Sequence, residues 1–262
     1  MILALSGFQE GEQEPAREAF TTRIPGSTWE LVMQPIPGTT TESGDPLEPF
    51  WLASRELTWD AFDAFVFEEL APSDDADALA RPTKPYITAD RGFGHEGWPV
   101  GSLSRKSAEA FCDWLEARVG GEWRLPTRVE WVHAALAGAP GPWHHGRKES
   151  GLEDVAWYKP NARRKTHPVG ELAPNAFGLH DMHGNVAEWV TTDDGKGRLM
   201  GGSYLDPAPK ITATSERVPS AGWNMSDPNL PKSPWWLADG PFAGFRVVCT
   251  TPPPPKASEE QR

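Results

Sequence analysis

The chain has little cysteine, no long hydrophobic run and a deficit of basic residues, and each shortage excludes a class of function. Only Cys112 and Cys249 are present, too few for a disulfide framework or a cysteine-rich zinc site. No apolar run approaches the ~20 residues of a membrane span. A formal net charge of -12 argues against nucleic acid as a partner, because proteins that bind phosphate backbones concentrate Lys and Arg.

The two cysteines and the first residues say little about compartment. Cys112 lies on the apolar face of "AEAFCDWLEA" and Cys249 follows "GFRVV", so both are predicted to be buried, unreactive thiols. The opening "MILALSG" is similar to the end of a secretory apolar segment, but it is short and has no basic residue before it. Localisation therefore stays open: periplasmic or secreted if a signal peptide has been truncated, cytoplasmic otherwise.

The length and composition fit one large domain or two small ones between two tails. With 262 residues, 38% of them hydrophobic, the chain can bury a substantial core. Residues 1–25, which contain "QEGEQEPAREAF", and residues 251–262 have too few apolar residues to pack, so we expect a domain at 26–250 and a disordered C-terminal tail. Strands are predicted within residues 27–38 and 48–58, and "EELAPSDDADALARP" is predicted to be an exposed acidic loop.

Hydrophobic spacing and capping residues predict three helices before residue 138. The first follows Thr58, the second follows Ser104 and stops at Gly120, and the third begins with a capping box formed by Thr127 and Glu130. His133 falls inside the third helix and has no partner at chelating spacing, so we interpret it as a packed residue. The apolar stripes of the first two helices comprise Phe62, Phe65, Val66, Leu70, Ala108, Phe111, Cys112, Leu115 and Val119.

The second half is rich in proline, glycine and tryptophan, and its stretch "NAFGLHDMHGNVAEWV" permits two interpretations. One is a metal loop, since two carboxylates and inward-turned carbonyls suit calcium. The other is a structural corner in which Gly178, Gly184 and Asn185 allow sharp turns. Zinc would prefer His180 and His183, but that spacing chelates only on a helix, which the glycine interrupts. The residues alone leave both interpretations open.

Several separate motifs agree in order with one known family. The segments "RLPTRVEW", "THPVGELAPNAFGLHDMHGNVAEWV", "MGGSYLD" and "AGFRVV" resemble the formylglycine-generating enzyme family, also called the sulfatase-modifying-factor domain. The resemblance runs from about Gly26 to Val248. It implies a single α+β domain with the family's C-type-lectin-like fold and little regular secondary structure.

The resemblance also implies a structural calcium ion as cofactor. Carried over by position, its ligands are Asp181, the backbone carbonyls of Gly184 and Val186, and Glu188. His183 then fills this loop. A second family calcium site precedes "THPVG", but "WYKPNARRKTHPVG" is basic and holds no aspartate, so that site is expected to be absent. The run from Arg163 to Lys165 is interpreted as solvated loop charge.

The family's copper chemistry is not expected in this chain. Active members carry two cysteines just after the "GGS" segment, and copper(I) selects such soft thiolates over carboxylates. In "GGSYLDPAPKI" the corresponding positions hold Asp206 and Ile211. We therefore assign no catalytic residue and no copper. A metal-dependent enzyme using His144 and His145 is disfavoured, since adjacent residues of an extended segment point in opposite directions.

A binding role remains the leading hypothesis, with an unknown peptide, protein or saccharide as ligand. The alternative is an oxidoreductase that uses non-standard chemistry at the same groove. At least one of Trp223, Trp235 and Trp236 is predicted to be exposed beside that groove, whereas Arg246 is predicted to form a buried ion pair. The resemblance places seven residues in the ligand-binding groove: Tyr204, Asp206, Glu216, Arg217, Trp223, Asn224 and Trp235.

Overall fold

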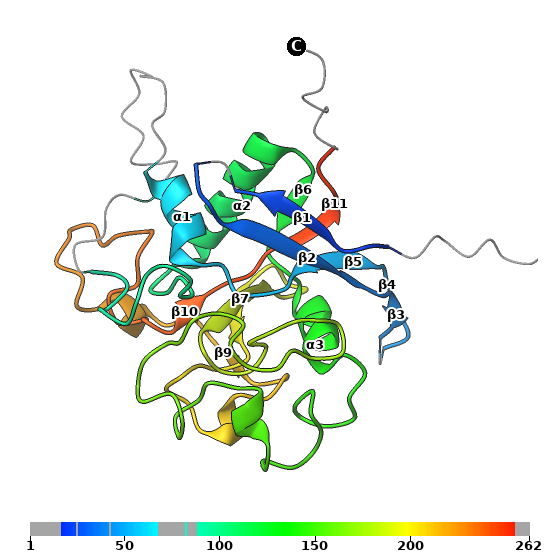
Figure 1. Cartoon of the computed structure of the whole chain (residues 1–262). Helices are drawn as coiled ribbons and strands as arrows, with labels where there is room; N and C mark the ends of the chain where they lie inside the picture. Colours follow the sequence, from blue (N-terminus) through cyan, green and yellow to red (C-terminus); the bar gives the residue numbers. More distant parts are fainter. Residues whose placement is uncertain (1–16, 25, 42, 68–81, 83–87, 255–262) are drawn as a thin grey trace, which may run out of the picture.

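A five-stranded antiparallel sheet lies at the centre of the computed structural model, which describes residues 17–24, 26–41, 43–67, 82 and 88–254 (Figure 1). Its strand order is β1-β2-β5-β11-β6. The last strand of the described chain thus joins an early strand, because β11 pairs with β5 through Val248 and Leu52. The five strands are β1 (Phe20–Arg23), β2 (Glu30–Ile36), β5 (Phe50–Ala53), β11 (Val248–Thr251) and β6 (Glu122–Arg124).

Strand β5 is buried on both faces, so the sheet separates two parts of the core. Trp51 and Ala53 belong to one hydrophobic cluster, and Phe50 and Leu52 belong to another. This division follows from the alternation of side chains along a strand. The strand "FWLA" is therefore a continuous apolar run, as expected for a strand covered on both sides.

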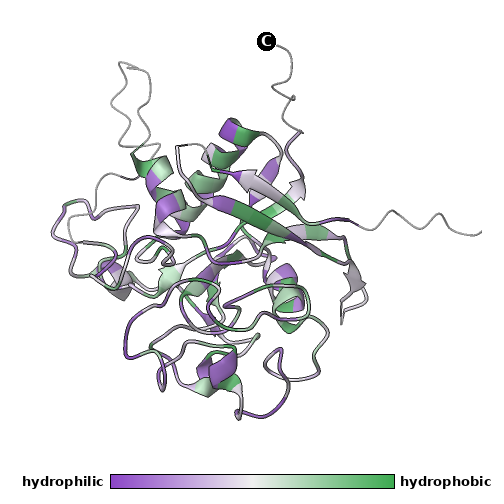
Figure 2. Cartoon of the chain, in the orientation of Figure 1, coloured by the Kyte–Doolittle hydropathy of each residue, from purple (hydrophilic) through white to green (hydrophobic). Residues whose placement is uncertain are grey.

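Helices α1 (Trp59–Val66) and α2 (Arg105–Val119) pack against one face of this sheet, and their hydrophobic sides turn inward (Figure 2). The predicted cap of α2 is confirmed, since the Ser104 side chain accepts a hydrogen bond from the Ser107 backbone. Thr58 stands at the N-cap of α1, but its side chain makes no cap hydrogen bond. The predicted capping box is also confirmed: Thr127 and Glu130 exchange hydrogen bonds at the start of α3 (Arg128–Leu136).

A smaller four-stranded sheet, ordered β10-β7-β8-β9, lies on the other side together with α3 and long loops (Figure 1). Its ladder β7–β8 is antiparallel and continues directly out of the "NAFGLHDMHGNVAEWV" loop. These strands are β7 (Ala187–Thr191), β8 (Gly197–Met200), β9 (Glu216–Arg217) and β10 (Ala243–Gly244); the remaining short elements are β3 (Thr39–Thr40), β4 (Pro46–Leu47) and the 3-10 turns η1 (Leu152–Asp154), η2 (Ala208–Lys210) and η3 (Ala221–Asn224).

The N-terminal boundary of the domain differs from the expectation. Residues 20–24, which we expected in a tail, instead form β1 and a buried Ile24, because β1 pairs along its length with β2. The C-terminal strand likewise extends to Thr251. Most of the expected acidic loop, Leu70 and the outer parts of both tails lie outside the described residues. Among the described residues, no helix has the length and apolar character needed to cross a bilayer.

The packing of α1 and α2 on the sheet leads to a stability prediction. Phe111 is fully buried and contacts Phe62 and Phe245, with ring centroids 5.9 and 5.6 Å away. Replacing Phe111 with Ala should lower the free energy of unfolding by about 3–5 kcal/mol, because it leaves a cavity among these rings. Phe67→Ala, at a residue that is 51% exposed, is the matched control and should cost less than about 1 kcal/mol in the same urea titration. Equal losses for both variants would contradict this assignment of the core.

Candidate functional site

The loop that precedes β7 is a structural corner held by backbone geometry. Asp181 and Asn185 both have positive φ, at 56° and 46°. Gly184 lies so close to the preceding loop that an added Cβ would sit 2.1 Å from the carbonyl oxygen of Trp157. Only glycine fits there, since any side chain would clash with backbone. At the loop's start, Asn175 accepts hydrogen bonds from the amides of Phe177 and Leu179.

A buried ion pair lies directly behind this corner. The Arg246 guanidinium donates from Nη2 to Oε1 of Glu188 over 2.6 Å and from Nε to Oε2 over 2.7 Å. The Trp131 indole donates to the same Oε2 over 2.7 Å. Both ionic side chains are at most 1% exposed. The predicted buried ion pair of Arg246 is therefore confirmed, and its partner is one of the residues that the resemblance assigned to calcium.

Two further carboxyl groups are buried beside this pair. Glu56 accepts hydrogen bonds from the Asn185 side chain and from the Val186 amide, at 2.7 and 2.9 Å. Burial raises the pKa of Glu56 well above its usual value, and the nearby carboxyl groups of Asp181 and Glu188 add to this rise. Burial likewise raises the pKa of Asp181 to about 6. The cluster thus holds three acids around the Arg246 guanidinium, and Arg55 also acts on Asp181.

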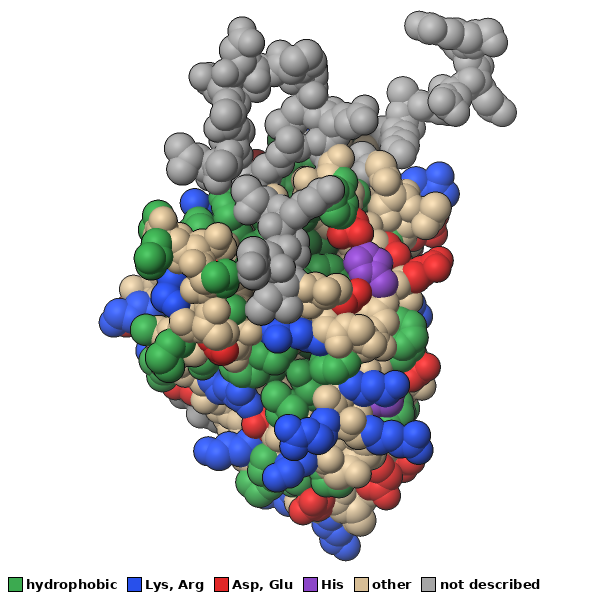
Figure 3. All heavy atoms as spheres, turned by 90° about the vertical axis from the view of Figure 1, so that its left-hand side faces the viewer, with side chains coloured by type: hydrophobic (Ala, Val, Ile, Leu, Met, Phe, Trp, Pro, Cys, Tyr) green, Lys and Arg blue, Asp and Glu red, His purple; other side chains and the backbone are tan. Residues whose placement is uncertain are grey.

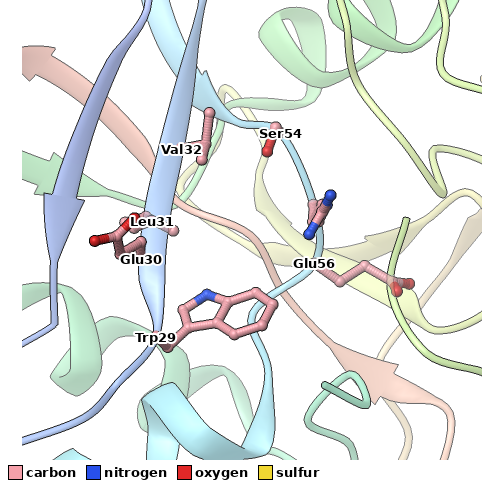
Figure 4. Close-up of a pocket in the computed structure, with 7 residues that line it drawn as sticks. Trp29, Glu30, Leu31, Val32, Ser54 and Glu56 are labelled. Carbon is pink, nitrogen blue, oxygen red and sulfur yellow. The ribbon is translucent and has the colours of Figure 1, made fainter. Parts of the chain in front are cut away.

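The hollow next to Glu56 is too small for a substrate. It lies between the start of β2 and the segment after β5, and Trp29 stands across from Glu56 at its opening (Figure 4). Its interior offers about 20 Å³, which is room for one water molecule. Among the described residues, no cavity large enough for a substrate opens onto these buried carboxyl groups at this point.

The calcium ligands implied by the resemblance do not fit an ion as these side chains stand. Both oxygens of Glu188 are already engaged by Arg246, so a cation there would have to displace a guanidinium. One Asp181 oxygen accepts from the Gly170 amide, whereas the other, Oδ1, is buried without a partner. Within the described ranges, no three His, Cys, Asp or Glu side chains are grouped as metal ligands would be. Arg246 supplies the positive charge beside Glu188.

The two positions that the resemblance matches to copper-binding cysteines hold Asp206 and Ile211, which cannot bind copper(I). Asp206 accepts hydrogen bonds from the amide and the hydroxyl of Ser203, both at 2.8 Å, and forms an ion pair with Arg217. Ile211 is fully buried and packs with Tyr158 in a small apolar cluster. The two cysteines of the chain are buried free thiols elsewhere, and burial raises the pKa of Cys249 to about 11 and that of Cys112 further.

The tryptophans do not form the predicted exposed wall. Trp235 and Trp236 are 2% and 7% exposed, and Trp223 is half-buried between Trp189 and Phe242. The prediction is therefore wrong for Trp235 as a groove residue. Its burial has a physical cause: the Ser104 amide and the Ser107 hydroxyl at the start of α2 both donate to the Trp235 carbonyl, which draws this segment into the core.

Only part of the expected groove set comes together. Asp206 and Arg217 form an ion pair, and the Arg217 guanidinium lies 4.4 Å from the Phe242 ring centre, whereas Tyr204 is buried against Phe93. Asn224 instead closes its own loop by accepting from the Ala238 amide. Glu216 forms an exposed ion pair with Arg128 of α3, 3.1 Å away.

The sequence reasoning missed two cations next to Tyr204. Arg91 and Arg164 act on its hydroxyl and oppose the burial that raises the Tyr204 pKa to about 12. One of them belongs to the run "RRK", which we had interpreted as solvated charge. The absence of aspartate and glutamate from residues 155–170 was the sequence feature that indicated a local positive charge.

The histidines near this region are buried and neutral. His183 is fully buried, and burial lowers its pKa to about 3. It contacts the Ile211 carbonyl through Nδ1 and stacks on His144, whose pKa is lowered by burial to about 4. His183 therefore lies in the interior behind the loop.

Comparison with known proteins agrees with this architecture. A family model described as "Sulfatase-modifying factor enzyme 1-like domain" matches residues 9–250. The chain belongs to this family. The resemblance drawn from the motifs is thereby confirmed, including the absence of the cysteine pair, since the chain's only two cysteines are the buried thiols at other positions.

Curated relatives include both active and inactive proteins. The formylglycine-generating enzyme of Mycobacterium tuberculosis is 36% identical over 108 residues, which are 37% of this chain and 34% of that protein. The inactive C-alpha-formylglycine-generating enzyme 2 of Bos taurus is 27% identical over 190 residues, which are 63% of this chain and 62% of that protein. The chain thus covers less than two thirds of the length of these relatives.

Solved structures share the fold. Treponema denticola variable protein 1 aligns with a TM-score of 0.64 at 20% identity, over 88% of this chain and 98% of that one. PvdO from Pseudomonas aeruginosa aligns with a TM-score of 0.58 at 20% identity, over 91% and 99%. The predicted α+β fold of the formylglycine-generating enzyme type is confirmed.

The ion pair behind the loop leads to the second prediction. Arg246→Met should lower the free energy of unfolding by about 3–5 kcal/mol, because it leaves Glu188 buried without a counter-charge. Arg23→Met is the matched control: its ion pair with Glu30 is 64% and 55% exposed, so the same substitution should cost less than about 1 kcal/mol. Urea unfolding of both variants measures the difference. A loss at Arg246 no larger than at Arg23 would show that the pair does not hold the loop.

The engagement of Glu188 leads to a third prediction, on metal dependence. An ion that binds only the native state raises the melting temperature as its concentration rises. Because Arg246 already occupies Glu188, neither a chelator nor added calcium should shift the melting curve. A rise with calcium that disappears in Asp181→Asn would contradict this and identify the free Asp181 oxygen as a ligand. Magnesium in place of calcium is the control for general ionic effects.

Proposed function

We propose that this chain is a non-oxidising member of the formylglycine-generating enzyme family that binds a protein or peptide ligand. The observation that carries the proposal is the pair of residues at the copper positions. Asp206 forms an ion pair with Arg217 and accepts a hydrogen bond from Ser203, and Ile211 is buried in an apolar cluster. Neither offers the soft sulfur that copper(I) requires. Relatives that are themselves named inactive support this reading.

The ligand role follows from what is retained around these positions. Arg217 is partly exposed beside Asp206 and over the Phe242 ring, and a guanidinium next to apolar contact area suits a polypeptide segment. A scaffold keeps its binding surface when its chemistry is lost, since fold and reactive groups are separable.

The fourth prediction tests the loss of oxidase chemistry. Purified protein reconstituted with copper(I) and supplied with oxygen and a cysteine-containing sulfatase peptide should leave the peptide mass unchanged, because no thiolate pair can hold the metal. An active formylglycine-generating enzyme under the same conditions is the positive control, and mass spectrometry is the readout. Formylglycine formed at an enzyme-like rate would overturn the proposal.

The ligand half of the proposal is tested separately on an array of random-sequence peptides. The wild-type protein should be retained by a subset of peptides that share a composition. Retention by none of them would contradict a peptide-binding role.

A further inference from the structure

One segment of this acidic protein is entirely basic. Residues 155–170 contain Lys159, Arg163, Arg164 and Lys165 and no aspartate or glutamate, in a chain of net charge -12. All four side chains are exposed. None of them forms an ion pair with any residue that the structure describes. Like charges gathered without counter-charges repel one another, so they are available to an anionic partner.

This segment is held by backbone hydrogen bonds to Asp206 and to the loop before β7. The Lys159 amide donates to the Asp206 carbonyl over 2.9 Å, and the Asn185 amide donates to the Trp157 carbonyl over 2.7 Å. The Trp157 and His167 rings stack 3.8 Å apart across the segment. The basic side chains therefore project from a held backbone, which lowers the entropy lost on binding.

Two more cations come from other parts of the chain. Arg91 is anchored by a hydrogen bond to the Ala238 carbonyl, and its charge, like that of Arg164, reaches the Tyr204 hydroxyl. Arg217 lies across the Phe242 ring and is paired with Asp206. We call Lys159, Arg163, Arg164, Lys165, Arg91 and Arg217 the basic face.

Aromatic rings lie among these cations. The Phe93 ring meets the Tyr204 ring edge-on at 5.7 Å. The side of the molecule on the left of Figure 1 shows, in its lower half, many Lys and Arg side chains around a strip of hydrophobic ones (Figure 3). Cations around apolar contact area suit a ligand with carboxylates and at least one large apolar side chain.

We propose that the basic face binds an acidic peptide segment of a partner protein. This rests on the proposed peptide-binding function and adds the charge of the ligand. A local positive surface on an acidic protein orients an approaching anion and repels cationic segments. Nucleic acid is the less favoured anion, because the negative charge over the rest of the molecule repels an extended phosphate backbone.

The test uses three fluorescent probes of equal length: a Glu- and Asp-rich peptide with one central Trp, the same peptide with Lys at every acidic position, and a single-stranded DNA oligonucleotide. Fluorescence anisotropy at low salt should show binding of the acidic peptide only, and added salt should weaken it. Lys159→Glu/Arg164→Glu should weaken this binding by about tenfold or more, since two exposed attractive charges become repulsive.

Arg147→Glu/Lys148→Glu is the matched control, because it makes the same charge change at another exposed basic pair. It should change the affinity for the acidic peptide by no more than about twofold relative to the wild type. The comparison therefore separates the effect of the position of the charges from that of the net charge. Melting curves of both double variants should match the wild type, since the four substituted side chains, Lys159, Arg164, Arg147 and Lys148, are all exposed. Equal losses in the two double variants, or tighter binding of DNA than of peptide, would overturn the proposal.

The peptide array separates this proposal from the one on which it rests. Retention of basic or neutral peptides but not acidic ones would overturn the acidic ligand and leave the peptide-binding function standing. Retention of no peptide would overturn both.

Discussion

The contact between Arg246 and Glu188 is the constraint on which the rest of the structure depends. Besides the carboxylate, the guanidinium donates to the carbonyl of Ala53 at 3.1 Å and to that of His180 at 2.9 Å. One side chain therefore joins the five-stranded sheet, the four-stranded sheet and the loop between them. A buried charge is stable only when its counter-charge and hydrogen bonds are all in place, so these three parts must adopt one relative arrangement.

The conformation of the loop follows from this arrangement. Asn185 must turn through a left-handed backbone so that its side chain reaches Glu56 at 2.7 Å while its own carbonyl accepts from the Tyr204 amide. The "GGSY" segment is thereby fixed by the same corner that the ion pair supports. The position of Asp206 therefore depends on the ion pair between Arg246 and Glu188 in the core.

The local features of this chain were predictable from sequence and the distant pairings were not. Ser104 and Thr127 cap their helices through contacts three residues away, so spacing alone revealed them. The resemblance assigned Glu188 to calcium, and sequence spacing gave no sign of its contact with Arg246, which lies 58 residues further along. Trp235 was placed at the surface for the same reason, since the groups that draw it inward belong to the start of a distant helix.

The fold accommodates the residues at the copper positions without strain on its charged core. Replacing two thiolates by Asp206 and Ile211 removes soft ligands but leaves no buried charge unpaired, because Arg217 balances the carboxylate and an apolar cluster takes the isoleucine. Neither substitution touches Arg246, Glu188 or the corner that they hold. The fold therefore does not depend on thiolates at these two positions.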